Sequence, residues 1–162
     1  KPKYCVGTAY HKLNKDTNQG NAWGNWDPDK FTVEDSAFGF VVMENGATIV
    51  LESSWALNSL DVREAVTSVC GTKGGADMND GLRFNGVKNG RQYVEKPDLS
   101  AGGVAFYEGN STDPSVLDMA QWVNAIRNDT DPCVLPEQAY VVTQILEGIY
   151  ESAKSGKPYY FN

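Results

Sequence analysis

A polar segment near the N-terminus contains the residues best suited to binding a ligand. The run "NAWGNW", residues 21–26, places two tryptophans among asparagines in a long stretch rich in Asn, Asp and Gly. Indole rings can stack on sugar rings and asparagine amides can bond to hydroxyl groups, so Trp23, Asn25 and Trp26 are candidate substrate-facing residues. The same indoles could instead anchor a long loop to the core, because aromatic side chains bury a large area. Both interpretations remain open.

Three other motifs favour structure over chemistry. His11 is the only histidine and no G-x-S-x-G sequence accompanies it, so we expect an ordinary residue at a strand end. The run "GTKGG", residues 71–75, is not followed by the helix that a phosphate-binding loop requires. The run "DMNDG", residues 77–81, lacks the spacing and the final glutamate of a calcium loop. We therefore predict no phosphate-binding or metal-binding residue.

Composition and charge narrow the class of protein. The chain has 162 residues, 41% hydrophobic and 22% charged, which suits one globular domain with a hydrophobic core. The net charge of −7 disfavours nucleic acid and anionic membrane surfaces, and no apolar run approaches the ~18–20 residues needed to span a bilayer. Three widely spaced cysteines suit reduced thiols in a cytoplasmic protein. We expect a cytoplasmic protein with neither nucleic acid nor membrane as a partner.

The strongest local signal is Asn45-Gly46, because both residues tolerate the positive φ of a tight hairpin turn. A two-residue turn pairs Phe40 with Leu51 and places them, with Phe38 and Trp55, on a large apolar face that we expect the helices to cover. The opposite face is small and mixed, a composition that suits contact between subunits. This predicted oligomer face consists of Ala37, Gly39, Val41, Met43, Val50, Glu52 and Ser54.

Strands are expected before helices along the chain. Residues 4–10 are a predicted strand, residues 65–78 a strand pair, and the next hairpin turns at either Asn85-Gly86 or Asn89-Gly90. One helix begins at Pro114, and another begins after Leu135-Pro136 and stops at Gly156. This order predicts an α+β domain over residues 1–162: an open, mostly antiparallel sheet with helices on one face. The apolar stripe of the last helix is predicted as Ala139, Val142, Leu146, Ile149 and Ala153.

Longer stretches of the chain resemble a known family. "EDSAFGFVVMENGATIVLESSWALN", "VCGTKGGADM" and "WVNAIRNDTDPCVLPEQAYVVTQILEGIYESAKSGKP" are similar, in matching order, to the C-terminal domain of the glucose–fructose oxidoreductase / inositol dehydrogenase (Gfo/Idh/MocA) family. The resemblance extends from about Val33 to Pro158 and is most specific in "IYESAKSGKP". It implies an α+β domain that follows an N-terminal Rossmann domain in NAD(P)-dependent dehydrogenases of sugars and cyclitols.

The resemblance also implies what this chain lacks. The fingerprint G-x-G-x-x-G is absent, and the family's helix with the catalytic Asp and His precedes the strand that opens this chain. The family's lysine motif E-K-P recurs in "VEKP", residues 94–97, but here it ends a polar hairpin, so we expect Lys96 to be a coincidence. We predict no catalytic, cofactor-binding or metal-binding residues, no activity for the chain alone, and NAD or NADP in the parent enzyme.

Two hypotheses follow. In the first, the chain is the substrate-facing and oligomerisation domain of an NAD(P)-dependent sugar or polyol dehydrogenase. Its partners are then its own N-terminal Rossmann domain, the substrate, and a second copy that contacts the open sheet face. In the second, the chain is a free-standing carbohydrate-binding module that uses Trp23 and Trp26.

Overall fold

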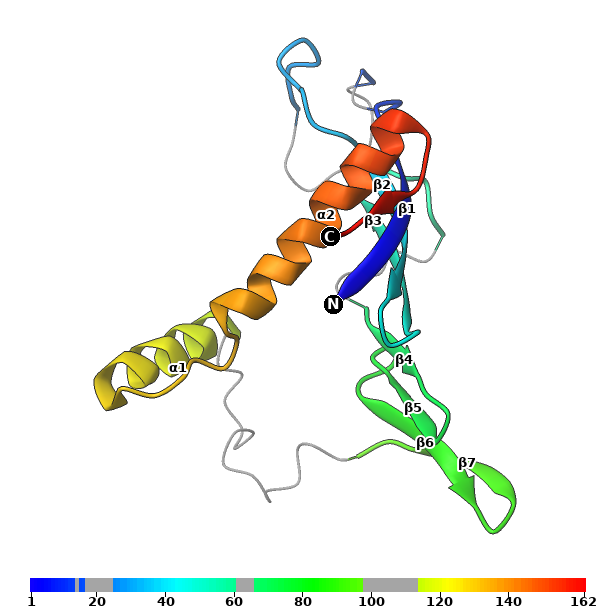
Figure 1. Cartoon of the computed structure of the whole chain (residues 1–162), viewed down its shortest axis with the longest axis vertical. Helices are drawn as coiled ribbons and strands as arrows, with labels where there is room; N and C mark the ends of the chain where they lie inside the picture. The colour runs from blue at the N-terminus through cyan, green and yellow to red at the C-terminus, as the bar shows by residue number, and fades with distance from the viewer. Residues whose placement is uncertain (14, 17–24, 61–65, 98–113) are drawn as a thin grey trace. The chain divides into compact units, whose positions relative to one another are not determined.

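The computed structural model describes residues 1–13, 15–16, 25–60, 66–97 and 114–162 (Figure 1). The chain divides into two compact units, one formed by residues 1–58 and 121–162 and the other by residues 59–120. Each unit contains a four-stranded antiparallel sheet. Two helices follow the strands of the second sheet in the sequence, which confirms the α+β class.

The sheet of the first unit has the strand order β3-β2-β1-β8. Helix α2 packs along β1 and also contacts β8 (Figure 1). It begins after Leu135 and ends at Gly156, whose φ of 66° is the left-handed conformation of a helix cap, as predicted. The elements of this unit are β1 (Pro2–Tyr10), β2 (Ser36–Met43), β3 (Thr48–Ser54), α2 (Pro136–Ser155) and β8 (Tyr159–Tyr160).

A pair of glycines lets α2 approach the sheet closely. Gly7 of β1 and Gly39 of β2 lie opposite each other in the ladder. A Cβ on Gly7 would lie 2.6 Å from Cγ2 of Ile149, and one on Gly39 would lie 2.4 Å from Cδ1 of the same residue. Ile149 therefore fills the space that two missing side chains leave. Around it the buried core contains Cys5, Val41 and Ile145.

The turn between β2 and β3 is one residue longer than predicted. The Met43 N–H donates to the Ala47 carbonyl, and the Gly46 N–H donates to the Met43 carbonyl. Gly46 has a φ of 86°, so the loop contains residues 44–46, with its glycine in the left-handed region. The prediction of a two-residue turn was wrong, and Phe40 pairs with Val50 instead of Leu51. A shift of one residue moves every β3 side chain to the opposite face.

The predicted oligomer face was wrong for β2. Val41 is 0% exposed and Gly39 is also buried, since both lie under α2. Phe40 and Val50, at 46% and 67% exposure, lie on the opposite side. Helix α2 packs on the side where the glycines permit close approach of the backbones, and not on the side with the larger side chains. Of the predicted set, Ala37, Gly39, Val41 and Met43 lie on the helix side, and Val50, Glu52 and Ser54 on the other.

The side of this sheet opposite α2 is called the outer face below. Strand alternation and the observed register place four rows of side chains on it. One row, formed by Val6, Phe40 and Val50, is apolar and runs across three strands. The outer-face rows are Tyr160, Tyr4, Val42 and Thr48; then Val6, Phe40 and Val50; then Thr8, Phe38 and Glu52; then Tyr10, Ser36 and Ser54.

The predicted stripe of α2 is only partly the buried one. Ile149 is buried as expected, but Val142 and Leu146 are 56% and 47% exposed. Gly148 takes part in the true contact surface, since a Cβ there would lie 2.6 Å from the Phe161 ring. Gly148 in the helix, like Gly7 and Gly39 in the sheet, thus allows the helix and its neighbours to pack closely. The buried residues of α2 are Ile145, Gly148, Ile149 and Ser152.

The second unit is built from two hairpins. The "GTKGG" run is a strand connection, as predicted, with the Gly71 N–H donating to the Gly74 carbonyl. Asn89 and Gly90 form the other turn, with φ values of 54° and 73° that suit a two-residue type I′ turn. The elements are β4 (Ser68–Cys70), β5 (Gly74–Asp77), β6 (Arg83–Lys88) and β7 (Arg91–Glu95), and α1 (Pro114–Asn128) follows with residues in both units.

Candidate functional site

The connection from β1 to β2 is fixed at its base by Asp35. This buried carboxylate accepts hydrogen bonds from the N–H groups of Lys12 and Leu13, at 2.5 and 2.7 Å. Its other oxygen accepts a hydrogen bond from the Ser36 hydroxyl at 3.0 Å. Asp35 therefore holds the start of the connection against its end. Sequence reasoning missed this residue, although an acidic residue just before an apolar strand was a visible signal.

Two aromatic residues of the same connection, Trp26 and Phe31, form a cluster with Trp55, which follows β3. Trp26 packs edge-on against Trp55, with ring centroids 4.9 Å apart and an interplanar angle of 87°. Phe31 contacts both rings, at 5.2 Å from Trp55 and 6.2 Å from Trp26. The packing of Trp26 favours the anchoring interpretation, although its side chain remains half-buried. Of the other two candidates, Asn25 is exposed and Trp23 lies outside the described residues.

Polar groups adjoin this cluster. The Tyr150 hydroxyl of α2 donates to Oε1 of Glu34 at 2.5 Å, and Nε1 of Trp55 donates to the Glu34 carbonyl at 3.3 Å. The hydrogen bond from Tyr150 holds the pKa of Glu34 below its usual range, and the charge of His11 adds a smaller lowering. The same hydrogen bond raises the pKa of Tyr150. In the ring of His11, Nδ1 lies 3.2 Å from the Val33 carbonyl oxygen.

We call this group the loop-base site. Its aromatic faces lie beside a carboxylate, a phenol and an imidazole, which together can hold a hydroxylated ligand by stacking and hydrogen bonding. Among the described residues, no group of three His, Cys, Asp or Glu side chains could hold a metal ion. The loop-base site consists of His11, Trp26, Phe31, Glu34, Trp55 and Tyr150.

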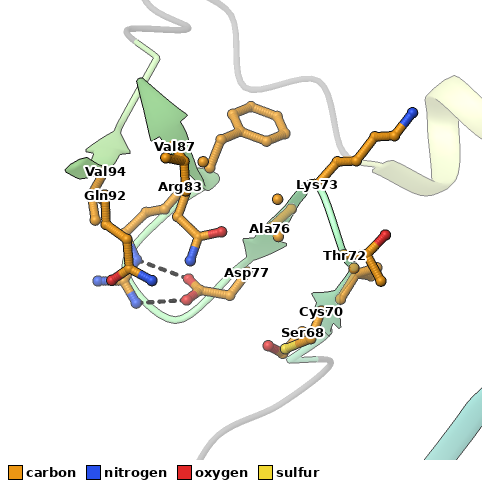
Figure 2. A pocket seen from close by; sticks show the side chains of 17 residues that line it. Ser68, Cys70, Thr72, Lys73, Ala76, Asp77, Arg83, Val87, Gln92 and Val94 are labelled. Atoms are coloured by element: carbon orange, nitrogen blue, oxygen red, sulfur yellow. Dashed lines mark hydrogen bonds and ion pairs between the residues drawn. The ribbon is translucent and has the colours of Figure 1, made fainter. Parts of the chain in front are cut away.

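A concavity lies on the sheet of the other unit, with a volume of about 370 Å³ (Figure 2). It contains a bidentate ion pair, in which Nε and a terminal nitrogen of Arg83 each donate to an oxygen of Asp77 at 2.8 Å. This bond lowers the pKa of Asp77 and raises that of Arg83. The two charges are matched to each other, so the pair explains local structure and provides no acid–base group.

Lys96 is paired at the surface. Its ammonium lies 3.0 Å from a carboxylate oxygen of Asp80, and both side chains are exposed. A catalytic lysine would need a partly desolvated setting to lower its pKa. This geometry supports the expectation that "VEKP" is a coincidence, which remains a prediction.

No helix in the described ranges is both long enough and apolar enough to cross a membrane.

Comparison with known families identifies the class of protein. Residues 6–161 match the family described as "Oxidoreductase family, C-terminal alpha/beta domain" of the Gfo/Idh/MocA group. The chain belongs to this family, as the resemblance in its sequence indicated.

Individual relatives extend that result. Over 148 residues the chain is 28% identical to D-glucoside 3-dehydrogenase of Escherichia coli (strain K12), covering 91% of this chain and 39% of that protein. The aldose-aldose oxidoreductase of Caulobacter crescentus, solved with glycerol, has a TM-score of 0.64 at 16% identity, over 99% of this chain and 42% of that one.

A third relative is an oxidoreductase from Agrobacterium radiobacter, solved with NAD+, L-tartaric acid and magnesium. It has a TM-score of 0.60 at 16% identity, over 97% of this chain and 42% of that one. At these identities the structures support the fold alone. The chain spans about two fifths of the length of each relative.

Proposed function

We propose that this chain is the substrate-facing and oligomerisation domain of an NAD(P)-dependent sugar or polyol dehydrogenase. The single observation that carries the proposal is the family match over residues 6–161. The relatives supply the finer chemistry by analogy, since one is a glucoside dehydrogenase and another was solved with NAD+. On this proposal residues 1–162 act as one C-terminal domain, and a Rossmann domain elsewhere in the parent enzyme holds the cofactor and the catalytic residues.

The loop-base site is the proposed substrate-facing part. It joins half-buried aromatic rings to Glu34, whose carboxylate is held in place by Tyr150 and ionised at neutral pH. Trp26 then acts through packing on Trp55, with its remaining exposed surface towards the substrate. The alternative, a free-standing carbohydrate-binding module, has weaker support because the ring of Trp26 is engaged by two other aromatic residues.

The outer face is the proposed subunit contact, in place of the face predicted from sequence. Val6, Phe40 and Val50 align across three strands and are all exposed. An apolar row of this kind favours burial against another surface. In a symmetric pair each substitution enters the interface twice, so a second copy of the chain is the proposed partner. We keep a cytoplasmic location, without nucleic acid or membrane as a partner, as part of the proposal.

The test uses the complete enzyme that carries this domain. Sugars and polyols are offered with NAD+ or NADP+, and the absorbance of the reduced nicotinamide is followed. We expect turnover with at least one sugar or polyol. We also expect Glu34→Ala to raise KM by about tenfold, the scale of one lost hydrogen bond to a charged group.

Glu44→Ala is the matched control, because the Glu44 side chain lies in an exposed ion pair with Lys1 at 3.7 Å, and its backbone hydrogen bond to Lys1 is kept in the variant. Its KM should stay within about twofold of wild type. An enzyme that oxidises no sugar or polyol would refute the proposed activity. Equal KM values for the Glu34 and Glu44 variants would refute only the role of the loop-base site.

A further inference from the structure

Three Asn-Gly dipeptides occur in the chain, at 45–46, 85–86 and 89–90. An asparagine before glycine is chemically labile, because the glycine nitrogen has no neighbouring Cβ to shield it and can attack the asparagine side-chain amide. The attack requires that the amide and the glycine N–H can both leave their existing contacts. The local structure therefore decides which of the three dipeptides reacts.

Asn85-Gly86 is protected by the sheet. Gly86 pairs with Gly74 on one side and with Tyr93 on the other, so its backbone is held between two strands. The ring of Tyr93 also covers it, since a Cβ on Gly86 would lie 2.9 Å from the Tyr93 hydroxyl oxygen. The glycine nitrogen cannot turn towards the Asn85 side chain without opening the sheet.

Asn45-Gly46 is protected by the hydrogen bonds of its turn. The side-chain oxygen of Asn45 accepts a hydrogen bond from the Ala47 N–H at 3.1 Å. The attacking nitrogen, that of Gly46, donates to the Met43 carbonyl at 3.0 Å. Both reacting groups are engaged, and both hydrogen bonds must break before the attack.

Asn89-Gly90 has neither protection. It forms the turn between β6 and β7, and both residues have positive φ. Among residues that the structure describes, the Asn89 side chain and the Gly90 N–H have no hydrogen-bond partner. Its chain neighbours aside, no atom lies within 4 Å of the position a Cβ would take on Gly90, and the same holds for Gly46, so the hydrogen bonds make the difference between these two turns.

We propose that Asn89 is a site of spontaneous deamidation in the folded chain. The Gly90 nitrogen attacks Cγ of Asn89, a nitrogen–carbon bond forms, and the bond from Cγ to Nδ2 breaks. Ammonia leaves with the proton from the Gly90 nitrogen, and a five-membered succinimide remains. Water then opens either carbonyl of the ring, which gives an aspartyl or an isoaspartyl residue. No oxidation or reduction takes place, and water is the only co-reactant.

The product changes both charge and backbone. A new carboxylate appears between Lys88 and Arg91, which are paired across the turn. The isoaspartyl form also inserts a methylene into the main chain. A two-residue turn fits its flanking strands only with normal backbone spacing. Modification therefore loosens the pairing of β6 with β7.

The test compares the dipeptides within one molecule. The folded chain is incubated at neutral pH and then cut with an arginine-specific protease. Cleavage after Arg83 and Arg91 yields one peptide that carries both Asn85 and Asn89, and fragment-ion masses locate the exchange of NH₂ for OH. We expect Asn89 to react about tenfold or more faster than Asn85, a difference of ~1.4 kcal/mol in barrier. Asn89 should also deamidate faster than Asn45, which lies in the peptide ending at Arg63.

Two controls complete the test. In denaturant the three rates should converge, because the dipeptides are then equivalent. Asn89→Gly removes the reactive amide and keeps a turn sequence that type I′ geometry accepts, so ammonia release from the folded chain should fall. The matched variant Asn45→Gly should leave release unchanged. Equal rates at Asn85 and Asn89 in the folded chain, or unchanged ammonia release from Asn89→Gly, would overturn the proposal.

Discussion

The two faces of the sheet in the first unit differ in the size of their side chains, and the smaller one became the core. On the helix side, Gly7 and Gly39 leave a space that Ile149 fills. On the outer face, Phe40 and Val50 remain exposed. Contact between a helix and a sheet depends on how closely the two backbones approach, and large side chains prevent that approach. The amount of apolar area on a face is therefore a poor guide to which face a helix covers.

The largest effect is expected from a charge placed on the helix side of the sheet. Val41→Arg puts an unpaired cation into the space beneath α2, where Val41 is fully buried. Burying an unpaired charge costs several kcal/mol, and a domain has only about 5–15 kcal/mol in total. We expect this variant to be largely unfolded by circular dichroism. A folded Val41→Arg chain would contradict the placement of the core.

The next largest effect is expected from adding atoms between helix and sheet. Gly7→Val must displace Ile149, including its carbonyl oxygen, which would lie 3.0 Å from the new Cβ. Overpacking of this kind costs about 3 kcal/mol. Urea unfolding measures the loss, and Thr8→Val, its neighbour on the outer face, should change stability by less than ~0.5 kcal/mol. Equal losses for the two variants would show that the faces do not differ in packing.

A smaller effect should follow from one buried hydroxyl. Ser152 accepts a hydrogen bond from the Gly7 N–H at 3.0 Å and donates to the Lys157 carbonyl at 2.7 Å. Ser152→Ala leaves both backbone groups without this partner, so we expect a loss of about 2 kcal/mol in unfolding free energy. The exposed residue Lys154 is a suitable control, since Lys154→Ala removes no such bond. A neutral Ser152→Ala variant would mean that water replaces the hydroxyl.

On the outer face the expected effect is on association. Phe40→Arg places a charge in the apolar row that we propose as the subunit contact, twice in a symmetric pair. Sedimentation at matched concentration should show a shift towards monomer. The urea midpoint should hardly move, because Phe40 lies outside the core. A wild-type chain that is monomeric at high concentration, or a variant that still associates, would count against this interface.

The smallest effect concerns the bond between Glu34 and Tyr150. The pKa of Glu34 is lowered on folding, so its contribution to stability is present above the unfolded value of ~4.3 and is lost as pH falls. The pKa of Tyr150 is raised, so its contribution is present below ~10 and is lost as pH rises through the folded value. Between these limits Tyr150→Phe should cost under about 1 kcal/mol, because both side chains are partly exposed.

Urea unfolding of wild type and Tyr150→Phe, at neutral pH and at a pH below the pKa of Glu34, measures the difference in unfolding free energy. This difference should shrink in acid, where Glu34 is protonated. Tyr140→Phe is the matched control, because Tyr140 lies exposed on the same helix. A difference that persists unchanged in acid would assign the cost to packing instead of the carboxylate.

Local signals predicted much of the fold. The end of α2 at Gly156 was predicted because it needs only its own backbone conformation. For the second hairpin the sequence left two turns open, Asn85-Gly86 and Asn89-Gly90, and the structure has the latter. Long-range choices were not predicted. The pairing of Gly7 with Gly39 brings distant parts of the chain together, and one extra residue in the turn at Asn45-Gly46 reversed the faces of β3. In the loop-base site, Trp26 was predicted, but Glu34 was missed because its partner Tyr150 is 116 residues away.

The connection of the last strand to the first also affects how the chain folds during synthesis. β8 pairs with β1, and the Phe161 N–H donates to the Lys3 carbonyl. The hydroxyl that accepts a hydrogen bond from the Gly7 N–H belongs to Ser152, 145 positions later in the chain. Contacts between such distant residues slow folding, because the loop must close before any of them contributes. After β2 has paired with β1, the other side of the β1 backbone therefore stays unpaired until β8 has been synthesised, a period in which chaperone binding would protect that edge from aggregation.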